Sequence, residues 1–251
     1  MFTLSCDRAY LYAHPERELS SDEAAQYEAV LAERSRGVPA QYITGHQEFW
    51  GMDFIVSPAV LIPRPETEHV VEAVLECVAK DGPGGELRIA DVGTGSGCIA
   101  LALAKELPQA AIHAIDISAA ALEIASANAA RHRLESRIEF HQGDLLAELS
   151  QNYFDFVVSN PPYVGESEAD EVQLEVRKFE PRNAVFAGPT GTEVIARLIP
   201  QARAVLKPSG RLVMEISATI AEETRRLLQV WREVEVKPDL QAIERVAIAK
   251  K

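Results

Sequence analysis

The sequence reads Leu-Arg-Ile-Ala-Asp-Val-Gly-Thr-Gly-Ser-Gly from Leu87 to Gly97. The apolar composition of 87–91 predicts a buried strand, and 93–97 forms a glycine-rich turn. A helix is predicted directly afterwards, over 98–107, and Pro108 ends it because proline cannot continue the hydrogen-bond ladder. A strand, a glycine turn and a helix in this order are typical of the first unit of a doubly wound α/β fold.

The chain beyond this unit continues to alternate between strands and helices. Further strands are predicted over 110–116, 138–141, 154–158, 211–216, 233–237 and 245–249. Helices are predicted over 118–131, capped by Ser118, and over 192–206 and 220–231. Repeated strand–helix units predict the α/β class, with a doubly wound, mostly parallel, seven-stranded Rossmann-like sheet and helices on both of its faces.

The region before the sheet has a different pattern. Residues 1–45 predict a small helical module, in which Ser20 and Glu23 have the spacing of a capping box. An apolar stripe in this module consists of Ala24, Tyr27, Val30 and Leu31 and predicts a thin core.

Two elements are predicted between this module and the glycine turn. Residues 48–56 predict a β-hairpin with Gly51 in its turn, and a helix with an apolar face over 70–78 follows Pro63. A loop is predicted over 81–85. We therefore divide the chain into a helical module at 1–45, a hairpin linker at 46–65 and the main domain at 66–251.

Composition excludes several classes of function. Acidic residues exceed basic ones by 38 to 25, which gives a net charge of −13 and disfavours a direct partner with a phosphate backbone. No apolar run approaches the roughly 20 residues that a membrane span needs, and the N-terminus lacks the features of a signal peptide. The cysteines have neither disulfide nor metal-site spacing, so we expect a cytoplasmic protein without a metal.

Acidic residues stand beside the predicted cofactor site. Asp91 leads the glycine loop, whose Gly93, Thr94, Gly95, Ser96 and Gly97 let the backbone approach a ligand. Asp116 ends the next strand, where its carboxylate can accept hydrogen bonds from ribose hydroxyls. Asp144 follows the third strand and is placed to accept from an adenine amine, with Leu145 against the ring.

A dinucleotide-binding site is the rival interpretation of this loop. Residues 95–100 satisfy the G-x-G-x-x-A fingerprint, and Asp116 suits a ribose of NAD. Asp91, however, places negative charge where a pyrophosphate would lie and where an α-amino group would be attracted. The acids at three strand ends therefore favour S-adenosylmethionine, while turn or cap roles for Asp91 and Asp144 stay open.

The fourth predicted strand runs directly into Asn160-Pro161-Pro162-Tyr163. Consecutive prolines fix two φ angles and remove two N–H donors, which makes this turn stiff and rich in acceptors. Asn160 adds an amide and Tyr163 an aromatic face with a polar tip. Such a site suits a planar –NH2 group, although an ordinary Asn-Pro turn has the same composition.

These motifs together resemble the class I methyltransferases that modify planar amino groups. Nearly the whole chain is similar to the peptide chain release factor glutamine methyltransferases, the HemK/PrmC family. The stretches that carry this resemblance outside the glycine loop and the Asn160 turn are Gln47-Glu48-Phe49-Trp50-Gly51, Leu61-Ile62-Pro63-Arg64-Pro65-Glu66-Thr67-Glu68, Phe179-Glu180-Pro181 and Glu244-Arg245-Val246.

The resemblance implies methyl transfer from S-adenosylmethionine to a glutamine side chain of a release factor, in translation termination. It implies that 66–251 is the methyltransferase domain and that the module at 1–45 docks the substrate. Family members usually carry a fuller N-terminal domain, so we expect this chain to begin partway through that module. We also expect a monomer.

The resemblance further implies catalytic roles for Asn160, Pro161, Pro162 and Tyr163. Asn160 and the Pro161 carbonyl would accept hydrogen bonds from the two amide N–H groups, Pro162 would keep the loop rigid, and Tyr163 would pack against the amide plane. Asn160 is expected to face the cofactor as well. Roles at the entrance of the site or in a structural linker stay open for Arg64, Glu66 and Thr67.

Two other functions remain to be weighed. An amino-methyltransferase acting on adenine or cytosine in nucleic acid shares the logic of the Asn160 turn, but the chain lacks a dense run of basic residues. A non-catalytic cofactor-binding protein is disfavoured because both the glycine loop and the Asn160 turn are intact.

Overall fold

The computed structural model describes residues 1–81 and 85–251, so most of the loop predicted over 81–85 lies outside the described residues. Its main sheet has seven strands in the order β10-β11-β9-β6-β3-β4-β5. The bounds are β3 Arg88–Val92, β4 Ala111–Asp116, β5 Ile138–Gln142, β6 Phe154–Ser159, β9 Leu206–Glu215, β10 Arg232–Pro238 and β11 Glu244–Lys250. β11 runs antiparallel to both of its neighbours, β9 and β10, and the other pairs of neighbouring strands in this sheet are parallel. This confirms the predicted mostly parallel sheet.

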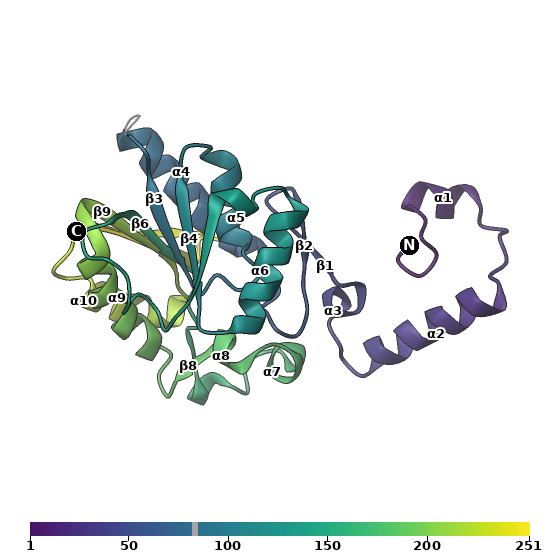
Figure 1. Ribbon diagram of the computed structural model, residues 1–251. Helices are drawn as coiled ribbons and strands as arrows, with labels where there is room; N and C mark the ends of the chain where they lie inside the picture. The colour runs from purple at the N-terminus through teal and green to yellow at the C-terminus, as the bar shows by residue number, and fades with distance from the viewer. Residues whose placement is uncertain (82–84) are drawn as a thin grey trace.

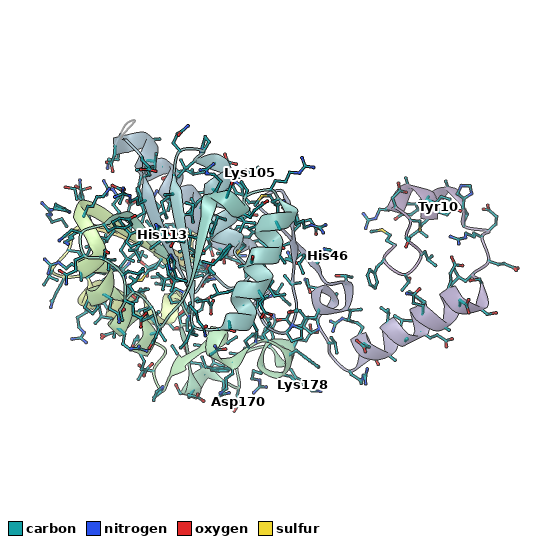
Figure 2. All side chains as sticks on the ribbon, in the orientation of Figure 1. Tyr10, His46, Lys105, His113, Asp170 and Lys178 are labelled. Carbon is teal, nitrogen blue, oxygen red and sulfur yellow. The ribbon has the colours of Figure 1, made fainter. Side chains whose placement is uncertain are left out.

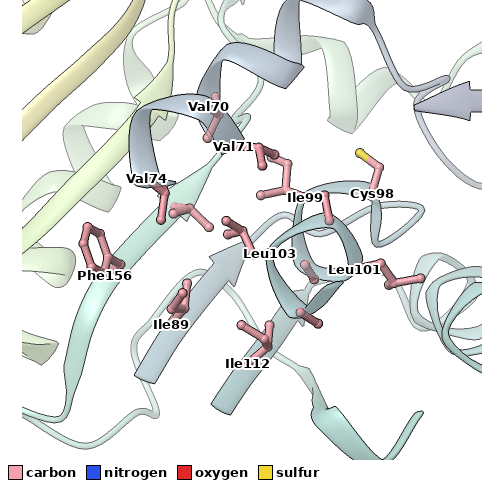
Figure 3. Packing of buried hydrophobic residues seen from close by; sticks show 14 of the residues in the cluster. Val70, Val71, Val74, Ile89, Cys98, Ile99, Leu101, Leu103, Ile112 and Phe156 are labelled. Carbon is pink, nitrogen blue, oxygen red and sulfur yellow. The ribbon is translucent and has the colours of Figure 1, made fainter. Parts of the chain in front are cut away.

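Helices cover both faces of this sheet, as the alternating pattern predicts (Figure 1). One face packs against α4 Glu68–Asp81, α5 Cys98–Glu106 and α6 Ala119–Arg131. Figure 3 shows side chains of this layer, where Val70, Val74 and Leu103 from the helices approach Ile89 and Phe156 from the strands. The other face packs against α9 Glu193–Val205 and α10 Ala221–Leu227.

The predicted hairpin consists of β1 His46–Phe49 and β2 Met52–Ile55. Trp50 and Gly51 both have positive φ, 54° and 65°, the conformation that two-residue hairpin turns favour. Phe49 is 1% exposed and Phe54 is fully buried, and both belong to the core formed by α4 and α5. The hairpin therefore packs against the core that α4 and α5 form with the sheet.

The N-terminal region forms α1 Arg8–Ala13, α2 Ser21–Ser35 and α3 Ala40–Thr44. The capping box at Ser20 and Glu23 is confirmed in both directions. The predicted thin core is wrong, because these helices contain no buried residue and Tyr27 and Leu31 are 47% and 48% exposed. Figure 1 shows α1 and α2 extending away from the sheet, and Figure 2 places Tyr10 on this extension.

Other differences from the sequence pattern lie after β6. β9 begins at Leu206, five residues before the predicted strand, and a register shift between Phe154 and Phe156 accommodates the expected turn over 207–210. The helix predicted over 220–231 is shorter and starts with a 3₁₀ turn at Ala218–Ile220. Elements that the pattern did not predict are β7 Val164–Gly165, a 3₁₀ turn Glu166–Glu168, α7 Leu174–Phe179, α8 Arg182–Val185 and β8 Phe186–Gly188.

Within the described residues, no helix has both the length and the apolar character needed to cross a membrane.

Candidate active site

A cavity of about 330 Å³ opens where the carboxyl ends of β3, β4, β5 and β6 meet. Most of the predicted site residues line it: Gly93, Thr94, Gly95, Ser96, Asp116, Asp144, Leu145, Asn160 and Pro162. Asp91, Gly97, Pro161 and Tyr163 lie outside its lining. The cavity lies at the edge of the sheet where doubly wound folds bind their ligands.

The glycine loop is held against β4 by backbone hydrogen bonds. The N–H groups of Gly93 and Thr94 both donate to the Ile115 carbonyl, at 2.8 and 3.0 Å. Gly97 has φ of 82°, and a Cβ added there would lie 2.8 Å from Leu101 Cδ1 and 3.2 Å from Ala125 Cβ. Gly97 is thus required for the close packing of α5 and α6 behind the cavity rather than for its wall.

Asp91 is buried beneath the loop. Its Oδ2 accepts from the Thr94 hydroxyl at 2.7 Å and from the Ala100 N–H at 3.1 Å, which ties the loop to the first turn of α5. Its Oδ1 is buried and has no hydrogen-bond partner among the described residues. Burial is the main cause that raises the pKa of this carboxyl from 3.8 to about 7.

Asp116 lines the cavity and also anchors the glycine loop by a hydrogen bond. Its Oδ2 accepts from the Gly95 N–H and its Oδ1 from the Ser118 N–H, each at 2.9 Å. A carboxylate offers about four acceptor positions, so both oxygens can accept a further hydrogen bond from a ligand.

Asp144 and Leu145 form the wall after β5. Asp144 makes an ion pair with Arg197 of α9, and both side chains are about half exposed, at 52% and 54%. Arg197 also lines the cavity, so the carboxylate that the sequence assigns to an adenine amine is shared with a guanidinium.

Asn160 follows β6 directly, and its amide is oriented by a chain of hydrogen bonds. Its Nδ2 donates to Thr67 Oγ1 at 3.0 Å, and the Thr67 hydroxyl donates to Glu215 Oε2 at 2.6 Å. Glu215 ends β9 and is 1% exposed. Because Nδ2 is engaged with Thr67, the acceptor atom Oδ1 is left for a ligand in the cavity.

The prolines and the tyrosine of this turn lie at different depths. Pro161 is buried, whereas Pro162 is half-buried and lines the cavity. The Tyr163 hydroxyl donates to Glu215 Oε1 at 2.9 Å, and burial raises the pKa of this phenol. Tyr163 lines a second, neighbouring pocket together with Glu215 and Arg245.

Comparison with known proteins relates this site to a family. The release factor glutamine methyltransferase of Koribacter versatilis (strain Ellin345) is 54% identical over 252 residues, which cover 100% of this chain and 88% of that protein. The chain belongs to the release factor glutamine methyltransferase family. The relative from Nitratidesulfovibrio vulgaris is 40% identical, over 99% of this chain and 84% of its own length. The resemblance noted in the sequence is thereby confirmed.

Domain families agree with this membership, and a solved structure shares the fold. The methyltransferase small domain family matches residues 67–178, and the PrmC N-terminal domain family matches residues 1–45. The ribosomal protein L11 methylase of Lactobacillus delbrueckii subsp. bulgaricus has a TM-score of 0.53 at 23% identity, covering 75% of this chain and 80% of that one. This likeness shows the fold alone.

The Pro-Arg-Pro-Glu-Thr-Glu stretch of this family member lies beside the cavity. Arg64 lines both pockets and forms an ion pair with Glu180, which is 7% exposed. Glu180 also accepts from the Ile62 N–H at 3.0 Å, so it anchors the stretch at two points. Thr67 lines the cavity, whereas Glu66 lines only the second pocket. Arg64 and Thr67 therefore lie at the site itself.

Glu215 and Arg197 are the residues at this methyltransferase site that sequence reasoning missed. A charged residue inside the run Leu-Val-Met-Glu-Ile at 212–216 was the available signal for Glu215. A carboxylate in such an apolar strand is unfavourable unless buried donors pair with it. No comparable signal pointed to Arg197, because it lies 53 residues from Asp144 in the chain.

Proposed function

We propose that this protein transfers a methyl group from S-adenosylmethionine to the side-chain amide nitrogen of a glutamine in peptide chain release factors. Family membership supports the reaction and the substrate class. The observation that carries the proposal is the orientation of Asn160, whose Nδ2 is bonded to Thr67 while Oδ1 remains as a neutral acceptor at the cavity.

The residues of the cavity fit S-adenosylmethionine. Apolar side chains such as Ile115 and Leu145 suit an adenine ring, and the free acceptor positions of Asp116 suit ribose hydroxyls. Gly93 and Gly95 expose backbone at the end where the amino-acid part of the ligand would lie. When bound, this cofactor supplies a methyl group on a positively charged sulfur.

The protein's own contribution is to orient the acceptor amide. An amide nitrogen is a poor nucleophile because its lone pair is delocalised into the carbonyl. Asn160 Oδ1 and the Pro161 carbonyl would accept hydrogen bonds from the two N–H groups and stabilise positive charge that develops on nitrogen. Pro162 would limit motion of the turn, and Tyr163 would support the amide plane. The product nitrogen becomes acidic only after transfer, so a general base in the transition state is unnecessary.

The substrate is proposed to be a folded protein that is held at two places. We assign docking to the module at 1–45, a connecting role to 46–65 and catalysis to 66–251. The helices α1 and α2 bury no residue of their own, which leaves their side chains available to a partner. The net charge of −13 disfavours nucleic acid as the direct substrate. We further propose that the protein acts as a cytoplasmic monomer in translation termination.

Transfer of labelled methyl groups tests this function directly. Purified release factor, a short peptide with the same glutamine loop and duplex DNA should be offered in parallel. We expect labelling of the release factor with a much higher kcat/KM than of the peptide, because remote contacts position the amide. Equal values for protein and peptide would remove the docking role. Labelling of DNA with none of the release factor would overturn the function.

A further inference from the structure

Glu215 is a buried carboxylate in direct contact with the machinery of the Asn160 turn. Its Oε2 accepts from Thr67 at 2.6 Å and its Oε1 from Tyr163 at 2.9 Å. Glu215 lines the second pocket but not the cavity itself, and the residue is only 1% exposed. It can therefore affect the reaction only through the groups that it holds.

The direction of each hydrogen bond follows from the number of protons available. An ionised carboxylate has none to donate, so the Thr67 hydroxyl must donate to Glu215. A hydroxyl carries a single proton, which means that Thr67 can only accept from Asn160. Asn160 must then offer Nδ2 to Thr67, at 3.0 Å, and turn Oδ1 away from it.

We propose that Glu215 is a positioning residue, which fixes the amide orientation of Asn160 through the Thr67 hydroxyl and so keeps the acceptor oxygen available to the substrate. This inference rests on the proposed function of the site. A protonated Glu215 would have the opposite effect: it could donate to Thr67, and the Thr67 proton would then be free to bond Asn160 Oδ1. The same three side chains would thus hold the acceptor atom back from the cavity.

The charge of Glu215 depends on groups from every neighbouring element. Burial raises its pKa above the ordinary 4.5, and Glu66 of the 3₁₀ turn Pro65–Thr67 acts in the same direction. The hydroxyls of Thr67 and Tyr163, and the guanidinium of Arg245 on β11, lower it. The ionised form is the active one, so turnover should be retained above the folded pKa and lost as the pH falls through it.

Glu215→Leu tests the direction of the hydrogen bonds. Leucine has no acceptor atom, so the Thr67 hydroxyl loses its acceptor and its proton becomes free to bond Asn160 Oδ1. We expect kcat for release factor methylation to fall on the order of 10²-fold, comparable to the loss of one oriented transition-state hydrogen bond. The KM for the release factor and the calorimetric cofactor affinity should stay unchanged, and the acidic limb of the kcat profile should disappear.

A matched pair at Thr67 provides the control, and it tests the positioning role by itself if Glu215→Leu fails to fold. Thr67→Ser keeps the hydroxyl and should retain most of kcat, whereas Thr67→Val keeps the shape and should lose kcat like Glu215→Leu. Wild-type kcat in Glu215→Leu or Thr67→Val, or equal losses in the two Thr67 variants, would overturn the positioning role. A wild-type protein that fails to methylate release factor would instead overturn the proposed function, so the two failures are distinguishable.

Discussion

The glycine loop and the Asn160 turn follow neighbouring strands, β3 and β6, yet the two halves of the site are held in different ways. At the glycine loop, Asp91 and Asp116 accept from the N–H groups of Ala100 and Gly95 and so fix the main chain, although Asp91 accepts from the Thr94 hydroxyl as well. Beneath the Asn160 turn, Glu215 accepts from side-chain hydroxyls and fixes side chains. Cofactor binding should therefore depend on backbone shape, and methyl transfer on the orientation of side chains.

Asn160→Ala is the strongest test of this separation. We expect turnover to fall about 10²–10³-fold, as when an oriented hydrogen-bonding group of a transition state is removed. Calorimetric affinity for the cofactor should remain close to that of the wild type, because the backbone of the glycine loop is untouched. Near-normal turnover would show that residues 160–163 form a structural turn without a catalytic role.

Gly97→Ala examines the backbone half, with Gly95→Ala as its matched control. Both glycines have positive φ, but only at Gly97 would a Cβ meet a neighbouring side chain, Leu101 Cδ1 at 2.8 Å. Gly97→Ala should lower the free energy of unfolding by about 2–3 kcal/mol, from the strained φ plus the clash. Gly95→Ala should cost about 1–2 kcal/mol from φ alone. Equal urea midpoints with unchanged slopes would contradict the packing argument.

Asp116→Ala should weaken cofactor binding by roughly 1.5–3 kcal/mol, the contribution of a hydrogen bond to a charged group. Isothermal titration calorimetry measures this loss, and kcat at saturating cofactor should change little because the Asn160 turn is intact. A folded variant with unchanged affinity would exclude the ribose role and leave Asp116 as an anchor for Gly95.

The pH dependence of stability gives the smallest expected effect. The folded pKa of Asp91 is about 7, above the ordinary 3.8, so the folded state binds this proton more tightly than the unfolded state does. The resulting stability is present at low pH and lost as the pH rises towards 7. Between pH 6 and pH 7, wild type should lose at most about 1.4 kcal/mol relative to Asp91→Asn. If the difference in unfolding free energy between the two proteins is the same at pH 6 and at pH 7, the pKa of Asp91 is not raised into this range.

The sheet and most of the cavity wall could be predicted from the sequence because their signals are local. Each strand is a short apolar run, and the glycine loop and the Asn160 turn both follow such a run directly. The elements between 164 and 188 were missed because they are short and have no sustained period. Glu215 was missed because its partners Thr67 and Tyr163 come from distant parts of the chain, 148 and 52 residues away.

The apolar stripe of α2 failed as a predictor for a different reason. Tyr27 and Leu31 lie on one helix face, as the period indicates, but no second layer covers them within the described residues. A periodic pattern predicts which side chains share a face. It does not tell whether that face meets another part of the same chain.

The strand order also constrains the order in which this sheet can form. β11 lies between β9 and β10 although it follows both in sequence. Within the described residues β10 pairs with β11 alone, so β10 has no place in the sheet until β11 is in position. The last two strands must therefore join the sheet together, after β9 is in place. A chain that lacked β11 would leave β10 unpaired and the edge of β9 open, and an open strand edge promotes aggregation.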